Sequence, residues 1–486
     1  MKRPSLFQKL LLYTLRFGLA VFILSFFWSD VYAQDKISLQ QAVELALKNN
    51  LQIKQAQLNE ALSDQNLKQS KAALLPTLNA GSNFNFRFGR SVDPFSYQFV
   101  NEQITSTDGS VFTSLTLFQG GQKLSQISQN KFLLESDKST TRKVRNDLSL
   151  DVVTTYLSIL NNNDLVTAAQ QQLDLSKQQL DRVQKQFDAG DKTLADLAQA
   201  KSQVATAELN LTNAQNQLDI SYLNLAQLME RDPASKFTIE VPVIDEIGKL
   251  NTAYSASDVF TQAVQNYPDI RIAEFDRLAA AKAVKVAQGN MYPQLNLQGS
   301  LGSGYSSNRQ RVLERVPTGT STPIGFVEGT NQVVLTPDIG TITERTPFSN
   351  QLDENFNQTI GFGLSIPIFN GFSSRSTVRR AKIGYQNAIL AEQLAKNSLN
   401  KVINQAVLDL KAAEKRYHSA QTAFESSKSA FFVIEQRYNV GLVNSLDLNQ
   451  AQTNFNKAEF DVIQAKYDLI FRSKLIDFYL GNPLTF

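Results

Sequence analysis

Two stretches of the chain, 251 residues apart, carry the same hydrophobic pattern with a period of seven residues. In each stretch a glycine then interrupts the pattern and a second series of the same period begins. The first series comprises Val152, Ile159, Val166, Leu173, Leu180 and Phe187, matched by Ile403, Leu410, Tyr417, Phe424, Phe431 and Tyr438. The second comprises Leu197, Val204, Leu211, Leu218 and Leu225, matched by Leu448, Phe455, Val462, Leu469 and Ile476. A sustained seven-residue period predicts helices that supercoil side by side, and two copies predict an internally duplicated body.

The first 33 residues read as a secretory signal peptide. Four cations precede an apolar run at 17–28, and Ala33 offers a small-residue cleavage site before Gln34. The alternative is a membrane anchor, but twelve residues form a helix of only about 18 Å, shorter than a hydrocarbon core of about 30 Å. We therefore expect residues 1–33 to be removed on export.

The charge of the exported part is close to neutral. Residues 1–33 hold four cations and Asp30, a net charge of +3, which equals the formal charge of the whole chain. The sequence pI of 8.7 is therefore no indication of nucleic-acid binding. The chain contains no cysteine, so disulfides, thiolate metal sites and a lipidated N-terminal cysteine are excluded.

Each half is expected to run from a helix into a β-hairpin. The helices are predicted at 38–75 and 257–292, because Pro76 and Pro293 follow them and proline cannot continue a helix. Alternating apolar and polar residues come next, and a period of two is typical of strands with two different faces. The clearest apolar set is Phe356, Ile360, Phe362, Leu364, Ile366 and Ile368.

These patterns predict one order of elements, used twice. After the signal peptide, the first repeat (34–233) has a hairpin at about 77–118 and a long helix hairpin at 122–229. A connector at 234–256 follows. The second repeat (257–486) has a hairpin at about 294–369 and a helix hairpin at 373–480. Residues 306–354 are rich in Pro, Gly, Thr and Ser without periodicity, which predicts a long external loop; a receptor-like site there is the alternative.

Four strands cannot close a barrel by themselves. Eight strands are about the smallest closed number, and an open sheet edge cannot face lipid. The strands are therefore expected to be shared between subunits, and three chains would supply twelve. Long polar runs on the helices, such as Gln170-Gln171-Gln172, suit a tube with water on both sides.

These features occur in the same order in both repeats, and in this the chain resembles the TolC-like outer membrane efflux family. The resemblance covers essentially the whole exported chain and depends on the proline-ended helices, the turns at Gly120 and Gly371, and the helix-hairpin turns at Gly190 and Gly441. It implies an α+β membrane protein, a trimeric β-barrel with four strands per protomer continuous with a coiled-coil α-helical barrel. The barrel would lie in the outer membrane and the helices in the periplasm.

The resemblance also implies partners. The homotrimer would pass small molecules such as drugs from an inner-membrane pump, of the RND or ABC kind, with a periplasmic adaptor (membrane fusion) protein docked on it. Outer membrane lipid is expected as a partner and nucleic acid is not. The alternatives are the outer membrane component of type I protein secretion and a soluble periplasmic coiled-coil scaffold; a scaffold would lack two strand hairpins with apolar faces.

The turns between the long helices are where the resemblance implies function. The adaptor-docking tips correspond to Asp188, Ala189, Gly190, Val440, Gly441 and Leu442. The periplasmic aperture corresponds to Asp196, Tyr438, Asp447 and Gln450. The plainer alternatives are turn residues, solvated aspartates near helix N-termini and, for Tyr438, a core position. This chain departs from the family pattern at Gln450, where a second acid is usual, and at Val443, where an arginine ties the closed state.

An enzyme is not expected. His418 is the only histidine and lies within a predicted long helix, so no catalytic triad or histidine metal cluster can form. No glycine-rich phosphate loop is present either. We therefore predict no catalytic residues, no metal and no cofactor.

Overall fold

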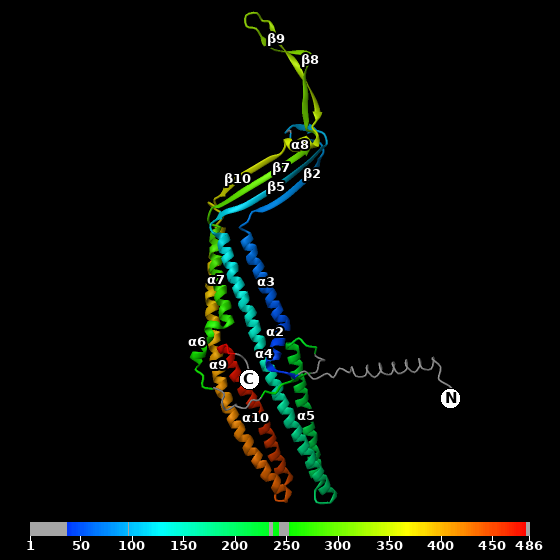
Figure 1. Ribbon diagram of the computed structural model, residues 1–486, viewed down its shortest axis with the longest axis vertical. Helices are drawn as coiled ribbons and strands as arrows, with labels where there is room; N and C mark the ends of the chain where they lie inside the picture. Colours follow the sequence, from blue (N-terminus) through cyan, green and yellow to red (C-terminus); the bar gives the residue numbers. More distant parts are fainter. Residues whose placement is uncertain (1–35, 96, 233–236, 243–251, 483–486) are drawn as a thin grey trace, which may run out of the picture. The chain divides into compact units, whose positions relative to one another are not determined.

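The computed structural model describes residues 36–95, 97–232, 237–242 and 252–482. The predicted signal peptide (1–33) lies outside the described residues, and the predicted connector (234–256) is described only in part. The described chain divides into two units, and the helices α4 (Gln122–Asp188) and α9 (Ser373–Asn439) contribute residues to both (Figure 1).

The first unit is helical and holds the ends of both long helix hairpins. Besides parts of α4 and α9 it contains α2 (Leu39–Asn49), α5 (Leu194–Leu228), α6 (Ala256–Asn266) and α10 (Ser445–Leu480). Two short parallel strands, β1 (Lys36–Ile37) and β6 (Thr238–Ile239), pair beside them. Heptad residues such as Ile159, Leu225 and Leu410 are completely buried. These residues form the coiled-coil contacts that the seven-residue period predicts.

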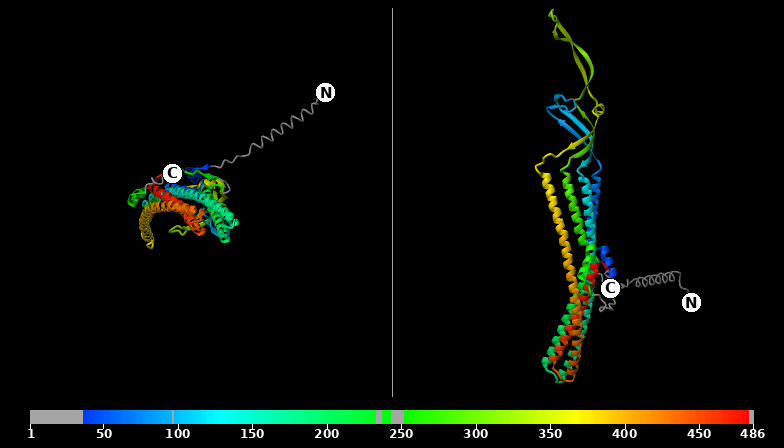
Figure 2. Two further views of the ribbon diagram at one scale, coloured as in Figure 1. Left: turned by 90° about the horizontal axis from the view of Figure 1, so that it is seen from below. Right: turned by 90° about the vertical axis from the view of Figure 1, so that its left-hand side faces the viewer.

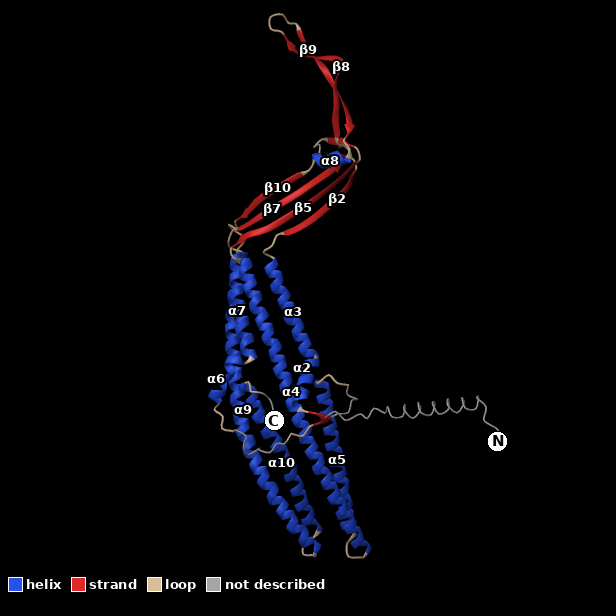
Figure 3. Ribbon diagram, viewed as in Figure 1, coloured by secondary structure: helices blue, strands red, loops and turns tan. Residues whose placement is uncertain are grey.

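The second unit contains a four-stranded antiparallel sheet (Figures 1 and 3). Its order is β10 (Asn357–Ser365), β7 (Gln294–Ser306), β5 (Ile104–Gln119) and β2 (Thr77–Arg87). The central pair β5–β7 joins the two repeats, with Leu115 opposite Leu297. Strands β10 and β2 are left as edges. The helices of this unit are most of α3 (Leu51–Ala72) and α7 (Pro268–Gly289), the short α8 (Phe348–Glu354), and parts of α4 and α9.

The helices predicted at 38–75 and 257–292 are each broken in two. Asn50 ends α2 with ψ 131° and Tyr267 ends α6 with ψ 125°, both outside the helical region. Tyr267 precedes Pro268, and a residue before proline is pushed towards extended backbone. Asn50 Oδ1 accepts the Gln52 N–H at 2.8 Å, which caps the helix that follows. The prediction of one continuous helix in each repeat was wrong, although the two breaks lie 217 residues apart, the same separation as Pro76 and Pro293.

Residues 306–354 are not the loop without periodicity that we predicted. They contain the antiparallel hairpin β8 (Gln310–Phe326) and β9 (Val333–Arg345), followed by the short helix α8 (Phe348–Glu354) (Figure 3). Threonine, valine and isoleucine favour strands, but three register shifts interrupt the pairing and conceal the period of two. Buried Gln351 holds the base of the hairpin, since its amide nitrogen donates to the carbonyls of Ser306 (2.9 Å) and Thr346 (2.8 Å).

A smaller antiparallel pair, β3 (Arg90–Val92) and β4 (Phe99–Asn101), lies between β2 and β5 in the sequence. In the part of the chain that the structure describes, no helix is both long enough and apolar enough to cross a membrane.

Candidate functional site at the helix-hairpin tips

The two long helix hairpins turn with the same backbone geometry. Gly190 and Gly441 have φ of 86° and 76°, the left-handed conformation that glycine adopts without a Cβ penalty. The Gly190 N–H donates to the Phe187 carbonyl at 2.9 Å, and the Asp191 N–H donates to the Gln186 carbonyl at 2.8 Å. This pair of hydrogen bonds is the Schellman motif that ends a helix.

The second turn repeats the motif 251 residues later. The Gly441 N–H donates to the Tyr438 carbonyl at 3.0 Å and the Leu442 N–H to the Arg437 carbonyl at 2.9 Å. The two turns lie side by side at one end of the first unit (Figures 1 and 2). Of the predicted tip residues, Ala189, Gly190 and 440–442 lie in the two turns, and Asp188 is the last residue of α4.

Asp196 and Asp447 occupy equivalent positions but differ in their contacts. Both lie at the third position of their helices, behind the N-caps Thr193 and Asn444. The Asp196 carboxylate accepts the Thr193 N–H at 3.1 Å and its hydroxyl at 2.8 Å, which completes a capping box. Exposed Asp447 donates its own N–H to Asn444 Oδ1 at 2.9 Å, but its carboxylate has no hydrogen-bond or ion-pair partner among the described residues.

Three side-chain contacts join the two tips. The Ser445 hydroxyl donates to Asp196 Oδ1 at 2.8 Å. The Lys192 ammonium lies 4.8 Å from the centre of the Tyr438 ring, within the range of a cation–π interaction. The Arg182 guanidinium donates to Asn439 Oδ1. Each contact runs from the first repeat to the second, so together they hold the two hairpins at their turns.

Tyr438 is buried beneath this contact. Its ring belongs to the heptad series, and its hydroxyl is enclosed without a hydrogen-bond partner. Most buried hydroxyls form a hydrogen bond. The Tyr438 hydroxyl forms none in the described chain, either to Asp196 or to another residue. Tyr438 is therefore a core residue that also contacts the second tip through Lys192.

Gln450 is exposed on the surface of α10. Its amide nitrogen donates to Asn454 Oδ1 at 3.0 Å, one helical turn further along. The structure thus brings Asp196 and Tyr438 into the contacts between the tips, while Asp447 and Gln450 lie on α10 outside those contacts.

The hydrogen bonds of Asp196 change its acidity. Acceptance from the Thr193 hydroxyl, then from Ser445 and the Thr193 N–H, lowers the pKa of the Asp196 carboxyl, because these donors stabilise the charged form. Asp196 therefore keeps its charge and its contacts throughout the neutral range.

Large apolar side chains project from the tips into solvent. Val440 is 70% exposed and Leu442 74% exposed, and Leu446 and Leu194 beside them are exposed to a similar degree. The two tips therefore expose apolar side chains from both repeats.

A polar seam separates the two hairpins within the first unit. It forms a hollow of about 520 Å³ between α4, α5 and α10, lined mainly by amide and hydroxyl side chains. The Asn456 amide nitrogen there is buried without a partner, and Gln452 on the same helix has the same property. The hairpins therefore meet along this seam through polar rather than apolar groups.

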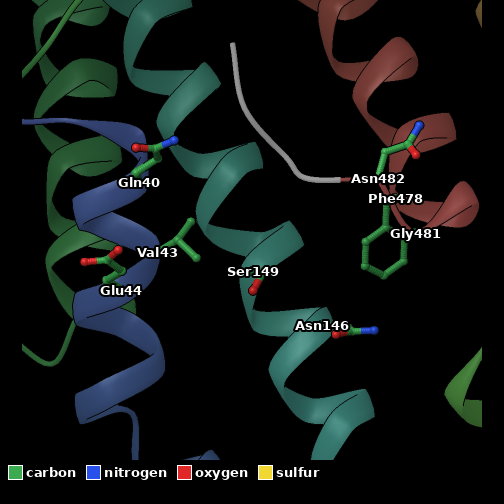
Figure 4. Close-up of a pocket in the computed structure, with 8 residues that line it drawn as sticks. All are labelled: Gln40, Val43, Glu44, Asn146, Ser149, Phe478, Gly481 and Asn482. Carbon is green, nitrogen blue, oxygen red and sulfur yellow. The ribbon is translucent and has the colours of Figure 1, made fainter.

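A second hollow of about 520 Å³ lies between α2, α4 and α10 (Figure 4). Its described lining consists of Gln40, Val43, Glu44, Asn146, Ser149, Phe478, Gly481 and Asn482. Glu44 is the one titratable side chain in this lining, so the hollow has no acid–base pair for catalysis. Among the described residues no group of histidine, aspartate and glutamate side chains is arranged to hold a metal.

The contacts at the tips include residues that the sequence did not single out. Arg182, Lys192, Asn439 and Ser445 carry no motif of their own. The sequence drew attention to Val443, where a cation is missing, whereas the structure provides cations at Arg182 and Lys192. The one signal in the sequence was that Arg182 and Lys192 lie near Gly190, and Asn439 and Ser445 near Gly441.

Comparison with known proteins agrees with this architecture. The family model described as "Outer membrane efflux protein" matches residues 42–230 and 259–482. The chain is 20% identical over 455 residues to "Outer membrane protein TolC" of Escherichia coli, covering 92% of this chain and 82% of that protein.

Solved structures give the same fold. A membrane protein from Pseudomonas aeruginosa superposes with a TM-score of 0.74 at 18% identity, covering 91% of this chain and 93% of that one. The Campylobacter jejuni CmeC outer membrane channel gives a TM-score of 0.73 at 18% identity, covering 92% and 87%. The α+β fold of long coiled-coil helices and a sheet is thus confirmed, and the chain belongs to the outer membrane efflux protein family.

Proposed function

We propose that this chain is the outer membrane exit duct of a tripartite efflux system and conducts small molecules passively. The observation that carries the proposal is the four-stranded sheet with two free edges, β2 and β10. On β10, Ile360 is 83% and Phe362 71% exposed. A sheet with an apolar face and open edges must be closed by other strands before it can lie in lipid.

Three copies would close this sheet into a twelve-strand barrel. Each β10 would pair with β2 of a neighbouring copy, so that no edge remains. Exposed apolar residues on α3 and α9, such as Leu58, Leu62 and Leu394, would be covered in the same assembly. The homotrimer would thus pair the open edges of the sheet and cover the exposed apolar residues of the helices.

The tips would receive a periplasmic adaptor protein. Val440 and Leu442 provide apolar surface beside Gly441, and Asp188, Ala189 and Gly190 form the matching turn of the first repeat. An adaptor bound there would connect the duct to an inner-membrane pump of the RND or ABC kind, which would supply the energy. The duct itself would have no catalytic cycle.

The contacts between the tips would act as the gate of the duct. Asp447, with its exposed and unpaired carboxylate, would line the aperture in three copies and favour cations. The polar seam between the hairpins, about 520 Å³ in volume, supports a gate because polar surfaces can be hydrated when helices separate.

Conductance in a planar bilayer tests the proposal. We expect discrete, repeatable ion-conducting steps from the detergent-extracted protein. Should the folded protein be silent, a variant with loosened tips, Ser445→Ala with Lys192→Gln, must conduct. Silence from that variant as well would refute the duct.

A further inference from the structure

The segments that connect the helices of the second unit to its sheet contain no acidic residue. They comprise residues 65–87, 114–131, 282–300 and 366–391. Together they carry eleven lysines and arginines, in a chain whose 48 cations are balanced by 45 anions. One of these cations, Lys68, pairs with Asp64 just outside the segment. The junction of helices and sheet is thus strongly cationic.

The charge is concentrated at the start of α9. We call the set of Arg375, Arg379, Arg380 and Lys382 the junction patch. All four side chains are exposed, and among the described residues none of them has an acidic partner. The Arg375 guanidinium lies 5.5 Å from the centre of the Phe372 ring, and Arg380 donates to the Thr377 hydroxyl at 3.3 Å.

Helix packing does not account for these cations. The equivalent positions in α4, 251 residues earlier, are Leu124, Ser128, Gln129 and Lys131, so three of the four are uncharged in a helix of the same length. Arg375, in the first turn of α9, also opposes the helix dipole. Neither helix packing nor the dipole therefore explains the junction patch.

The junction patch is continuous with exposed apolar surface. Ile368 is 95% exposed, and the Phe369 and Phe372 rings beside it meet edge to face at 5.5 Å. A shallow hollow of about 160 Å³ lies here, lined in part by Phe372, Arg375 and Ser374. Aromatic and apolar groups next to cations are typical of the boundary between hydrocarbon and headgroups.

The dimensions of the patch suit that boundary. Arg375, Arg379 and Lys382 are spaced by four and three residues, so they share one face of α9. From Arg375 to Lys382 the helix rises roughly 10 Å, which is comparable with a headgroup layer and the electrostatic field just beyond it.

We propose that the junction patch binds anionic phospholipid headgroups in the periplasm-facing leaflet of the outer membrane. The apolar residues from Ile366 to Phe372 would lie in the hydrocarbon, and the cations would contact the phosphates. A second copy of this chain is a poorer partner, because its own junction segments contain no carboxylate to offer. The inference rests on the proposed barrel, but it concerns the lipid contact and not conduction.

Binding of labelled lipids to the purified full-length protein in detergent tests the inference. We expect fluorescent phosphatidylglycerol to bind more tightly than phosphatidylcholine with the same label. The variant Arg375→Gln, Arg379→Ser, Arg380→Gln should lose at least about tenfold in phosphatidylglycerol affinity and keep its phosphatidylcholine affinity. Two of these substitutions introduce the residues that α4 has at the equivalent positions, so the helix should be preserved.

Two further variants make the test specific. Lys401→Gln, Lys411→Gln, Lys415→Gln removes the same charge from exposed positions of α9 in the first unit and should bind phosphatidylglycerol as the unmodified protein does. The arginine-to-lysine triple variant should retain binding. Should the neutral patch variant not assemble, Arg379→Ser alone should lose about fivefold.

Equal phosphatidylglycerol affinity in the patch variant and the unmodified protein would overturn the inference, as would an equal loss in the Lys401 control variant. Bilayer conductance separates this failure from a failure of the proposed function. A patch variant that conducts ions but binds both lipids equally has lost the lipid site and kept the duct.

Discussion

The Ser445 hydroxyl donates a 2.8 Å hydrogen bond to the Asp196 carboxylate and so links α10 to the start of α5. The same carboxylate caps α5 through Thr193. Asp447, 251 residues further along, has neither contact. The repeat thus supplies one aspartate that joins the tips and one whose charge is free to act on ions.

Ser445→Ala should loosen the tips without disturbing the cap of α5. The lost hydrogen bond has a net value of about 1 kcal/mol, and the Thr193 capping box remains. We expect a higher conductance or more frequent opening in planar bilayers. Ser429→Ala is the matched control, because Ser429 is exposed on α9 and donates only to a carbonyl of its own helix. Identical conductance in the two variants would contradict a role for this contact in the gate.

Asp447→Asn should reduce the cation selectivity of the pore. The substitution removes the exposed carboxylate and retains the N–H that Asn444 accepts. Three copies near one axis would raise the local cation concentration, so the reversal potential in a salt gradient should move towards zero. Asp447→Glu keeps the charge and should keep the selectivity. An unchanged reversal potential in Asp447→Asn would remove this residue from the aperture.

The period of seven was enough to predict the long helices, because the heptad residues of α4, α5, α9 and α10 are buried or half-buried in the structure. The break at Tyr267 was visible in the sequence as Pro268. The break at Asn50 had no such marker, since asparagine there acts through a local cap. Hairpin β8–β9 was missed because both of its faces are largely exposed and its pairing shifts register, so its sequence lacks the alternation on which strand prediction depends.

The tips were predictable in their backbone but not in their side-chain contacts. Gly190 and Gly441 mark the turns because only a left-handed residue completes the Schellman motif. The contacts of Lys192 with Tyr438 and of Arg182 with Asn439 depend on how one hairpin packs against the other. A heptad pattern predicts that the two helices of one hairpin pack together. It does not predict how one hairpin packs against the other.

Phe362→Arg should prevent assembly in the membrane. Phe362 is exposed on the apolar face of β10 between Ile360 and Leu364, and an arginine facing lipid near the bilayer centre costs about 2–4 kcal/mol. We expect little or no trimer in outer membrane extracts. Thr359→Arg places the same residue on the other face of the strand and should assemble. A normal trimer yield from Phe362→Arg would contradict the barrel.

Acidification should disorder the outer part of hairpin β8–β9. The hydroxyls of Thr322 and Thr320 donate to the Asp338 carboxylate at 2.5 and 2.9 Å, and these bonds lower the pKa of Asp338. Because the folded pKa is the lower one, the stabilisation is present above the ordinary carboxyl pKa of about 3.9 and is lost as the pH falls through the folded value.

A tryptophan at the end of the hairpin would report this transition. Trp28 is the chain's only tryptophan and precedes the expected cleavage site, so Phe326→Trp would give a single signal from the exported protein. Its emission should stay constant from neutral pH down to about 4 and change below that. Adding Asp338→Asn should abolish the transition, because the amide does not titrate. A transition that persists in the double variant would assign the acid sensitivity to another group.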